Sequence, residues 1–285
     1  MNILIYCLLI IIILYFISNF IYKNEFNSNI SLLKLKDLNY NPKIKTCVLI
    51  SGQIRDKIYE CIMSQKIFIF DPLNVDIFAV FSDNVNDDVK RYVIKLLKPK
   101  EILWVKDNKN MNKNLSLPLS SYIMTDKILQ CNNLKKGYEI KNNFYYDINI
   151  KSRIDLIIKN YIPENIINNI QNNTIYYPTL NSSDIFTNSV HGITDQFLLG
   201  NNESMNIFSN IYNNIITTNN SNTSIIEIFL KNYLNNNKIK TVKINNFKFI
   251  LTKFISDENN IEVLIKKFID DSNKSNYLNI FNYVI

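Results

Sequence analysis

The stretch YYDINIKSRIDLIIKN (Tyr145–Asn160) carries charged side chains inside a run that otherwise has the pattern of a β-strand. Polar and apolar residues alternate, which puts Ile148, Ile150, Ser152, Ile154 and Leu156 on one face and Asp147, Asn149, Lys151, Arg153 and Asp155 on the other. A half-exposed edge strand would produce this pattern. A strand whose polar face ends at a ligand would produce it too, so the neighbouring segments must decide.

Short apolar runs alternate with longer helical patterns before this stretch. The predicted strands are TCVLIS (Thr46–Ser51), VDIFAVFSD (Val75–Asp83) and EILWV (Glu101–Val105), and the predicted helices are Arg55–Phe70, Asp87–Leu97 and Ser120–Lys141. TCVLIS is a continuous apolar run, as expected of a strand that is covered on both faces. Alternating strands and helices predict an α/β domain with a mostly parallel sheet flanked by helices.

Polar residues stand at the carboxyl end of each of these predicted strands. They are Ser51-Gly52-Gln53, Ser82-Asp83, Lys106-Asp107, and Arg153 with Asp155. In open α/β sheets, ligands bind beyond the carboxyl ends of the strands. We therefore expect these residues to line one crevice, which would explain the charges in the fourth strand.

The second half of the chain has a less regular pattern. TIYYP (Thr174–Pro178) and the residues after a turn in HGITDQFLLGN (His191–Asn201) predict strands, as do KIKTVKI (238–244) and FKFILTK (247–253). Helical spacing is present in Ser204–Tyr212, Ser224–Leu234 and Glu258–Asp271. Because no internal repeat is visible, we expect one continuous domain over residues 46–285.

The first 24 residues predict a transmembrane anchor. Ile3–Tyr22 is uncharged and almost entirely apolar, and a membrane-spanning helix needs about 20 such residues. A cleaved signal peptide is the alternative, but a basic start and a small-residue cleavage site are not evident. Residues 25–45 are polar and predict a stem. The chain is therefore expected at a membrane as a single-pass protein, on a side that the flanking charges do not fix.

Charge and composition narrow the class of ligand. The net charge is +7, but the lysines are scattered and form no dense patch with aromatic residues, so a nucleic-acid partner is not expected. A modest positive field suits an anionic small substrate such as a nucleotide diphosphate. The four cysteines are far apart without a CxxC spacing, which argues against a zinc site and a disulfide framework.

Five segments in one order resemble a known group of proteins. LISGQIR, VDIFAVFSD, YYDINIKSRIDL, GITDQFLLGN and IIEIFLKNYL are similar to the ordered motifs of predicted GT-A-type glycosyltransferases, which are common in large DNA viruses and bacterial surface-polysaccharide loci. The resemblance spans most of Thr46–Leu234. It implies a Rossmann-like sheet and a membrane-anchored enzyme that moves a sugar from a nucleotide-sugar to a hydroxyl of a glycan, protein or lipid.

The resemblance also implies roles for acidic residues. GT-A enzymes usually bind a divalent metal, Mn²⁺ or Mg²⁺, through an Asp-x-Asp motif, and the matching position here reads Arg153-Ile154-Asp155. Asp155 is then the candidate metal ligand, with His191 as a second, and Arg153 would contact a phosphate. One carboxylate of the motif is replaced by an arginine, which puts metal dependence in question.

The remaining candidate residues would bind the substrates. Asp195 occupies the position of a catalytic base in the resemblance, Glu227 that of a residue facing the acceptor, and Asp83 could contact the base or ribose. Gly52 and Gln53 form a turn through which the backbone could approach a ligand, and Arg55 could reach a phosphate. Plainer readings are a tight turn for Gly52, a turn-capping Asp195, a surface histidine and a solvated helix face at Glu227. A non-catalytic glycan- or nucleotide-binding module on a membrane is the alternative function.

Overall fold

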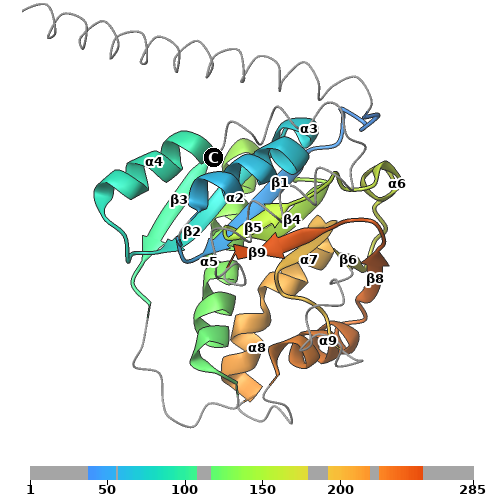
Figure 1. Cartoon of the computed structure of the whole chain (residues 1–285). Coiled ribbons are helices and arrows are strands. Elements are labelled where there is room, and N and C mark those ends of the chain that lie inside the picture. The colour runs from blue at the N-terminus through green and yellow to red at the C-terminus, as the bar shows by residue number, and fades with distance from the viewer. Residues whose placement is uncertain (1–37, 56, 108–116, 179–191, 219–224, 253–285) are drawn as a thin grey trace, which may run out of the picture. The chain divides into compact units, whose positions relative to one another are not determined.

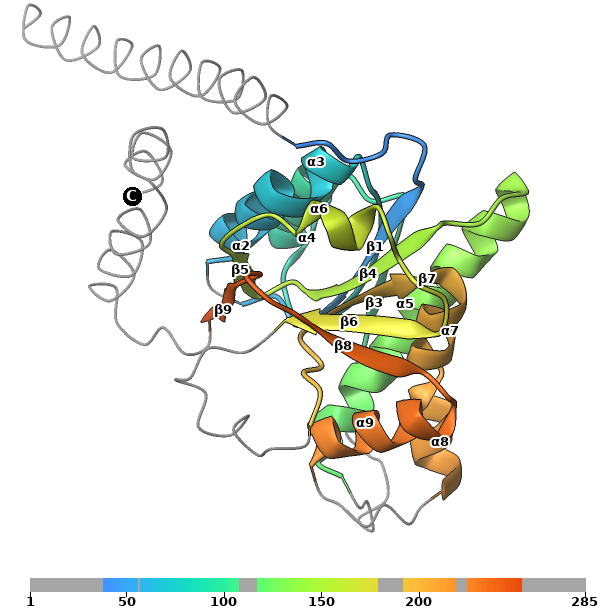
Figure 2. The ribbon, with the colours of Figure 1, turned by 90° about the vertical axis from the view of Figure 1, so that its right-hand side faces the viewer.

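A computed structural model describes residues 38–55, 57–107, 117–178, 192–218 and 225–252 (Figures 1 and 2). The predicted anchor, most of the predicted stem, His191 and the predicted helix Glu258–Asp271 lie outside these ranges. Within the described ranges, no helix is both long and apolar enough to cross a membrane. A compact unit begins at Tyr40, so the last residues of the predicted stem belong to it. The Tyr40 hydroxyl donates to the Ile162 carbonyl at 2.6 Å.

A seven-stranded, mostly parallel sheet forms the centre of this unit, in the order β3-β2-β1-β4-β7-β6-β8. Its strands are β1 (Thr46–Gly52), β2 (Asp76–Ser82), β3 (Glu101–Val105), β4 (Ile148–Arg153), β6 (Thr174–Pro178), β7 (Phe197–Asn201) and β8 (Lys240–Ile244). β3, β2, β1 and β4 are parallel, whereas β7 runs antiparallel to its neighbours β4 and β6. The predicted α/β class and mostly parallel sheet are confirmed.

Helices cover both faces of the sheet (Figures 1 and 2). They are α2 (Ile58–Gln65), which continues through the π-helix η1 (Lys66–Phe70) into α3 (Asp71–Leu73), then α4 (Asp87–Leu97), α5 (Leu119–Asn142), α6 (Glu164–Ile167), α7 (Asn202–Ser209), α8 (Ile211–Thr218) and α9 (Ile226–Asn236). α5 packs against β1 and β2 and also contacts α7 and α8. The helix predicted over Ser204–Tyr212 is therefore divided between α7 and α8.

Apolar side chains of the strands and of α5 form the core beneath the first strands. Leu49, Phe78 and Val80 pack with Cys131 of α5 and with Tyr146, all nearly or fully buried. Burial on both faces explains why the central residues of β1 and β2 are continuously apolar rather than alternating. A second core cluster joins α5 to α7, α8 and α9.

The stretch Tyr145–Asn160 is not one strand. β4 ends at Arg153, the chain turns at Ile154 and Asp155, and Leu156–Ile158 forms β5, which pairs with β9 (Phe249–Leu251) in a separate two-stranded sheet. β4 is an interior strand between β1 and β7, which excludes the edge-strand interpretation. Its polar face is buried, and Lys151 has no exposed surface.

Candidate functional site

The strand order changes direction at β1 and β4, and their carboxyl ends form the candidate site. β1 pairs with β2 on one side and with β4 on the other, all in parallel, and Ser51 lies opposite Arg153. A crevice opens at such a switch point because the connections from the two strands leave to opposite sides. The topology therefore brings Gly52 and Arg153 together at the position where open α/β sheets bind ligands.

Gly52 ends β1 in a backbone conformation that favours glycine. Its φ is +144°, whereas a β-carbon at this position would meet only Ile154 Cγ2, at an ordinary contact distance of 3.6 Å. The glycine is required by the backbone and not by lack of space. This conformation turns the chain out of the sheet directly beside the Ile154–Asp155 turn.

Two arginines converge on the carboxylate of Asp155. Arg153 donates from Nε to Oδ1 at 2.9 Å and from a terminal nitrogen to Oδ2 at 2.8 Å, and Arg55 Nε lies 3.7 Å from Oδ2. The Asp155 side chain is buried, whereas the Arg55 side chain is 40% exposed. Burial disfavours the charge of Arg153, but the hydrogen bonds and charge of Asp155, with the charge of Asp195, raise its pKa.

The turn that carries Asp155 is fixed from two sides. Gln65 of α2 donates to the Arg153 carbonyl at 2.9 Å, and the backbone N–H of Thr252, just after β9, donates to the Asp155 carbonyl at 3.1 Å. The Thr252 hydroxyl donates to the same carbonyl. Two distant segments therefore hold this turn in place, because Gln65 lies 88 residues before Arg153 and Thr252 lies 97 residues after Asp155.

The residues present fit a divalent metal poorly. Both oxygens of Asp155 accept from Arg153, and two guanidinium groups lie where a cation would have to bind. In the described ranges, no three acidic, cysteine or histidine side chains are gathered so that they could hold a metal ion. Two positive charges against one negative charge instead favour an anion, and Arg is the side chain that matches phosphate oxygens with a planar fork.

Asp195 reaches the same edge because β7 is antiparallel to β4. The residues before Phe197 therefore lie beside the carboxyl end of β4, where Arg153 N–H donates to the Gln196 carbonyl at 3.2 Å. The turn is capped by Thr194, whose hydroxyl accepts from Gln196 N–H, and not by Asp195. Within the described part of the chain, the Asp195 carboxylate has no hydrogen-bond partner.

Lys151 is a further functional candidate, which the sequence places on the polar face of the strand but does not mark as buried. Its ammonium group donates to the backbone carbonyl of Asp195 from inside the sheet. Burial lowers its pKa to about 8, against the opposing effect of Asp195 and Asp155. The sequence signal for Lys151 was its position in the middle of a strand whose other face is mostly apolar. A charged group buried in this way is expected to have a shifted pKa.

A second polar cluster lies at the carboxyl ends of β2 and β3. Lys127 of α5 contacts Asp107 at 2.5 Å, Ser82 donates to the same carboxylate at 3.0 Å, and Gln53 donates to it at 3.2 Å. Partial burial acts to raise the pKa of Asp107, but Lys127, Ser82 and Gln53 lower it overall. Lys127 is buried, and the pattern of α5 gives no sequence signal for it, because the buried face of this helix mixes polar and apolar residues.

The other predicted residues are less closely joined to this edge. Asp83 forms an ion pair with Lys90 of α4 at 2.5 Å. Glu227 lies in the first turn of α9, and its backbone carbonyl accepts from Ile193 N–H at 3.1 Å. A β-carbon on Gly192 would lie 2.8 Å from Glu227 Cβ, so glycine is required there by close packing. α9 thus supports the segment that leads to Asp195.

No protein-family model and no curated protein matches the chain. Its chemistry must therefore be argued from the site itself. The described residues join Gly52, Arg55, Arg153, Asp155 and Asp195 at one switch point, with Lys151 beneath them. This arrangement provides fixed positive charge beside an acidic side chain, at the edge where an α/β sheet binds its ligand.

Proposed function

We propose that the chain is a membrane-anchored GT-A-type glycosyltransferase that moves a sugar from a nucleotide-sugar to a hydroxyl of a glycan, protein or lipid. The observation that supports this most is the pair Arg55 and Arg153 beside Gly52, at the strand-order switch point of a mostly parallel sheet. The order of the motifs along the chain supports it as well.

In this proposal the arginines bind the diphosphate of the donor. Asp155 holds the guanidinium of Arg153 in a fixed orientation through two hydrogen bonds, so little ordering is needed when a ligand arrives. Arg55 is more exposed and supplies a second fork from the loop after β1. Together with Lys151 they would stabilise the negative charge that develops on the leaving diphosphate. A metal on Asp155 is not part of this mechanism.

Asp195 is the proposed base if the transfer inverts the configuration of the sugar. The acceptor hydroxyl oxygen attacks the anomeric carbon, and its proton passes to the Asp195 carboxylate. The bond between the anomeric carbon and the diphosphate oxygen breaks, and its electron pair leaves with the nucleoside diphosphate. The carboxylate is suited to this step because, among the described residues, it is not engaged in another hydrogen bond.

Transfer by the full chain tests this function. The protein is incubated with UDP-, GDP-, CDP- and dTDP-sugars and a mixed panel of hydroxyl acceptors, with and without EDTA, and products are identified by mass spectrometry. We expect nucleoside diphosphate release coupled to sugar transfer that persists in EDTA. Arg153→Ala should abolish it, whereas Arg91→Ala, on the exposed side of α4, should not. Equal activity of Arg153→Ala and the wild type would refute the assignment.

A non-catalytic nucleotide-binding module is the second candidate. It is favoured by the engagement of Asp155 with two arginines, because this carboxylate occupies the metal-binding position in the resemblance. The same incubation separates the two functions. Binding of a nucleotide-sugar with neither hydrolysis nor transfer would identify the module.

A further inference from the structure

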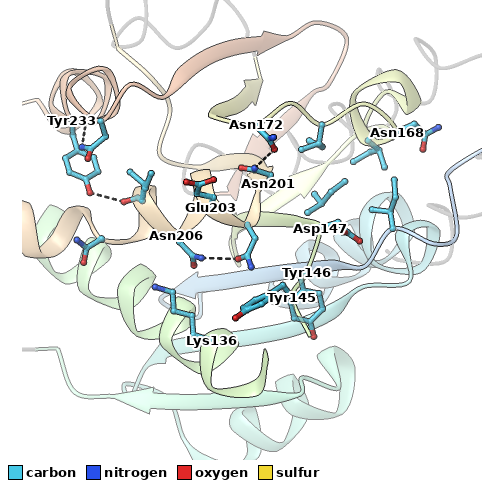
Figure 3. A pocket seen from close by; sticks show the side chains of 18 residues that line it. Lys136, Tyr145, Tyr146, Asp147, Asn168, Asn172, Asn201, Glu203, Asn206 and Tyr233 are labelled. Carbon is cyan, nitrogen blue, oxygen red and sulfur yellow. Dashed lines mark hydrogen bonds between the residues drawn. The ribbon is translucent and has the colours of Figure 1, made fainter. Parts of the chain in front are cut away.

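A large pocket lies at the amino edge of the sheet, at the opposite end of β4 from the candidate site (Figure 3). Its volume is about 1050 Å³. Ile148, the first residue of β4, lines it, whereas Arg153 is the last residue of that strand. At about 3.3 Å per residue, the two ends are roughly 17 Å apart. A single sugar ring cannot contact both, so the pocket is a separate site.

The lining of this pocket is rich in amides and carries little net charge. Asparagine is about one residue in six of the chain but seven of the eighteen residues that line the pocket, an enrichment beyond the composition of the chain. The charged lining residues are Lys136, Asp147 and Glu203, which leave one net negative charge. Repulsion by that charge disfavours an anion, in contrast to the arginine-rich carboxyl edge.

A buried ion pair holds two of these amides in place. Lys135 and Glu139 of α5 lie 3.4 Å apart and are almost completely buried. The Asn202 and Asn206 side-chain carbonyls accept from Lys135, and the Asn202 amide nitrogen donates to Glu139 at 3.0 Å. Figure 3 shows the further bond from Asn206 to Asn202. The amides on this wall are therefore fixed before a ligand binds, which lowers the entropic cost of binding.

An exposed aromatic ring stands beside these amides. Tyr145 is 72% exposed and lies between α5 and β4. The hydroxyls of the other two lining tyrosines are used inside the protein, because Tyr146 donates to Asp76 and Tyr233 to the Ile207 carbonyl. Tyr145 lines the same pocket as Asn206 and Glu203, below which it is drawn in Figure 3. A flat, amphipathic ring at a polar pocket can stack on the C–H face of a sugar.

We propose that this amino-edge pocket binds a neutral oligosaccharide. An amide side chain has two N–H donors and an oxygen that accepts two hydrogen bonds. Asn206 uses one of each inside the protein, so one N–H and one acceptor position remain for sugar hydroxyls, and the exposed Glu203 carboxylate can accept from two hydroxyls. Tyr145 supplies the stacking surface. The site is distinct from the proposed donor site and does not depend on the proposed transfer reaction.

Calorimetric titration of the full chain, in a detergent without a sugar headgroup, tests the proposal. The probes are neutral oligomers of glucose, galactose, mannose and N-acetylglucosamine, with oligogalacturonate as the charged counterpart. We expect at least one neutral series to bind. Tyr145→Ala should weaken that binding by about tenfold, and Glu203→Ala should weaken it by a few fold. Tyr145→Phe should bind as the wild type does.

Ile140→Ala is the matched control, because Ile140 lies on α5, is 76% exposed and does not line the pocket. All these substitutions are at exposed positions, so the fold should persist. The proposal is overturned if no neutral series binds, if Tyr145→Ala and Ile140→Ala bind alike, or if oligogalacturonate binds more tightly. Because UDP binding at the carboxyl edge is titrated separately, failure here leaves the proposed function standing.

Discussion

Arg153 and Asp155, only two positions apart, form a two-pronged ion pair of 2.9 and 2.8 Å at the end of β4. The pair is possible because the chain leaves the strand at Ile154 and turns the carboxylate back toward the guanidinium. In the proposed GT-A resemblance, Arg153 stands at a position where a metal-binding carboxylate would be expected.

Asp195→Asn should reduce sugar transfer by about 10² to 10⁴-fold, the usual contribution of a general base, because the amide cannot take the acceptor proton. Nucleoside diphosphate affinity should stay within about twofold of the wild-type value, because Asp195 is not assigned to the donor. Parallel transfer and titration measurements check this. A loss of donor affinity equal to the loss of transfer would show that Asp195 acts in binding.

Gly52→Ala should lower the free energy of unfolding by about 1–3 kcal/mol, because the φ of +144° is strained for any residue with a β-carbon. Gly137→Ala is the matched control. Gly137 lies within α5 with nothing near its missing β-carbon, so alanine should stabilise the chain by about 0.5–1 kcal/mol. Urea unfolding measures both changes. A neutral Gly52→Ala variant would contradict the role given to this turn.

Lys151 should make stability depend on pH in an identifiable window. Its folded pKa is lowered from 10.5 to about 8, so between these values the unfolded chain holds a proton that the folded chain has lost. Stability from this group therefore increases as the pH rises from 8 to 10.5 and is lost again as the pH falls through 8. A shift of this size corresponds to about 3 kcal/mol as an order of magnitude.

Lys151→Met should remove this contribution while it keeps the volume of the side chain. Unfolding of both proteins at several pH values between 7.5 and 10.5 isolates the contribution of Lys151 from that of other titrating groups. We expect the wild type to gain more stability with rising pH than the variant does. Identical pH profiles would mean that Lys151 does not carry a lowered pKa.

Lys127→Met should raise the pKa of Asp107, because the buried lysine is the main partner that lowers it. The variant should also be less stable by about 2–4 kcal/mol, as an acid is left without its cation in a largely buried position. The double variant Lys127→Met with Asp107→Asn should recover part of that loss. Thermal unfolding and carboxyl titration by NMR measure these effects. A double variant less stable than Lys127→Met would exclude the pairing.

The sequence predicted the sheet well because the pattern of apolar runs directly reflects burial on both faces. TIYYP, EILWV and Asp87–Leu97 have the predicted bounds, and the first two strands differ from prediction by one residue at one or both ends. The carboxyl-edge residues Gly52, Arg153 and Asp155 also follow from strand order alone. The end of β4 could not be predicted, because the alternation of polar and apolar residues continues through Ile154 and Asp155 although the backbone turns there.

What could not be predicted depends on contacts between distant segments. α5 buries Lys127, Lys135 and Glu139 along one face, and their partners come from β2, α7 and the loop after β3. A helix pattern gives no sign that a lysine has such a partner, so a charged residue reads as exposed. The amino-edge pocket also depends on contacts between distant segments. Its asparagines come from several separate stretches of the chain, where each resembles an ordinary loop residue.

We propose that the guanidinium groups at the β1–β4 switch point bind a diphosphate. Titration of UDP, GDP, CDP and dTDP into the full chain in EDTA tests it most directly, with Arg153→Ala and the exposed Arg91→Ala as a matched pair. We predict that at least one nucleotide binds and that Arg153→Ala weakens it by about 10- to 100-fold, while Arg91→Ala has no effect. Absence of binding, or equal binding by the two variants, would contradict the account.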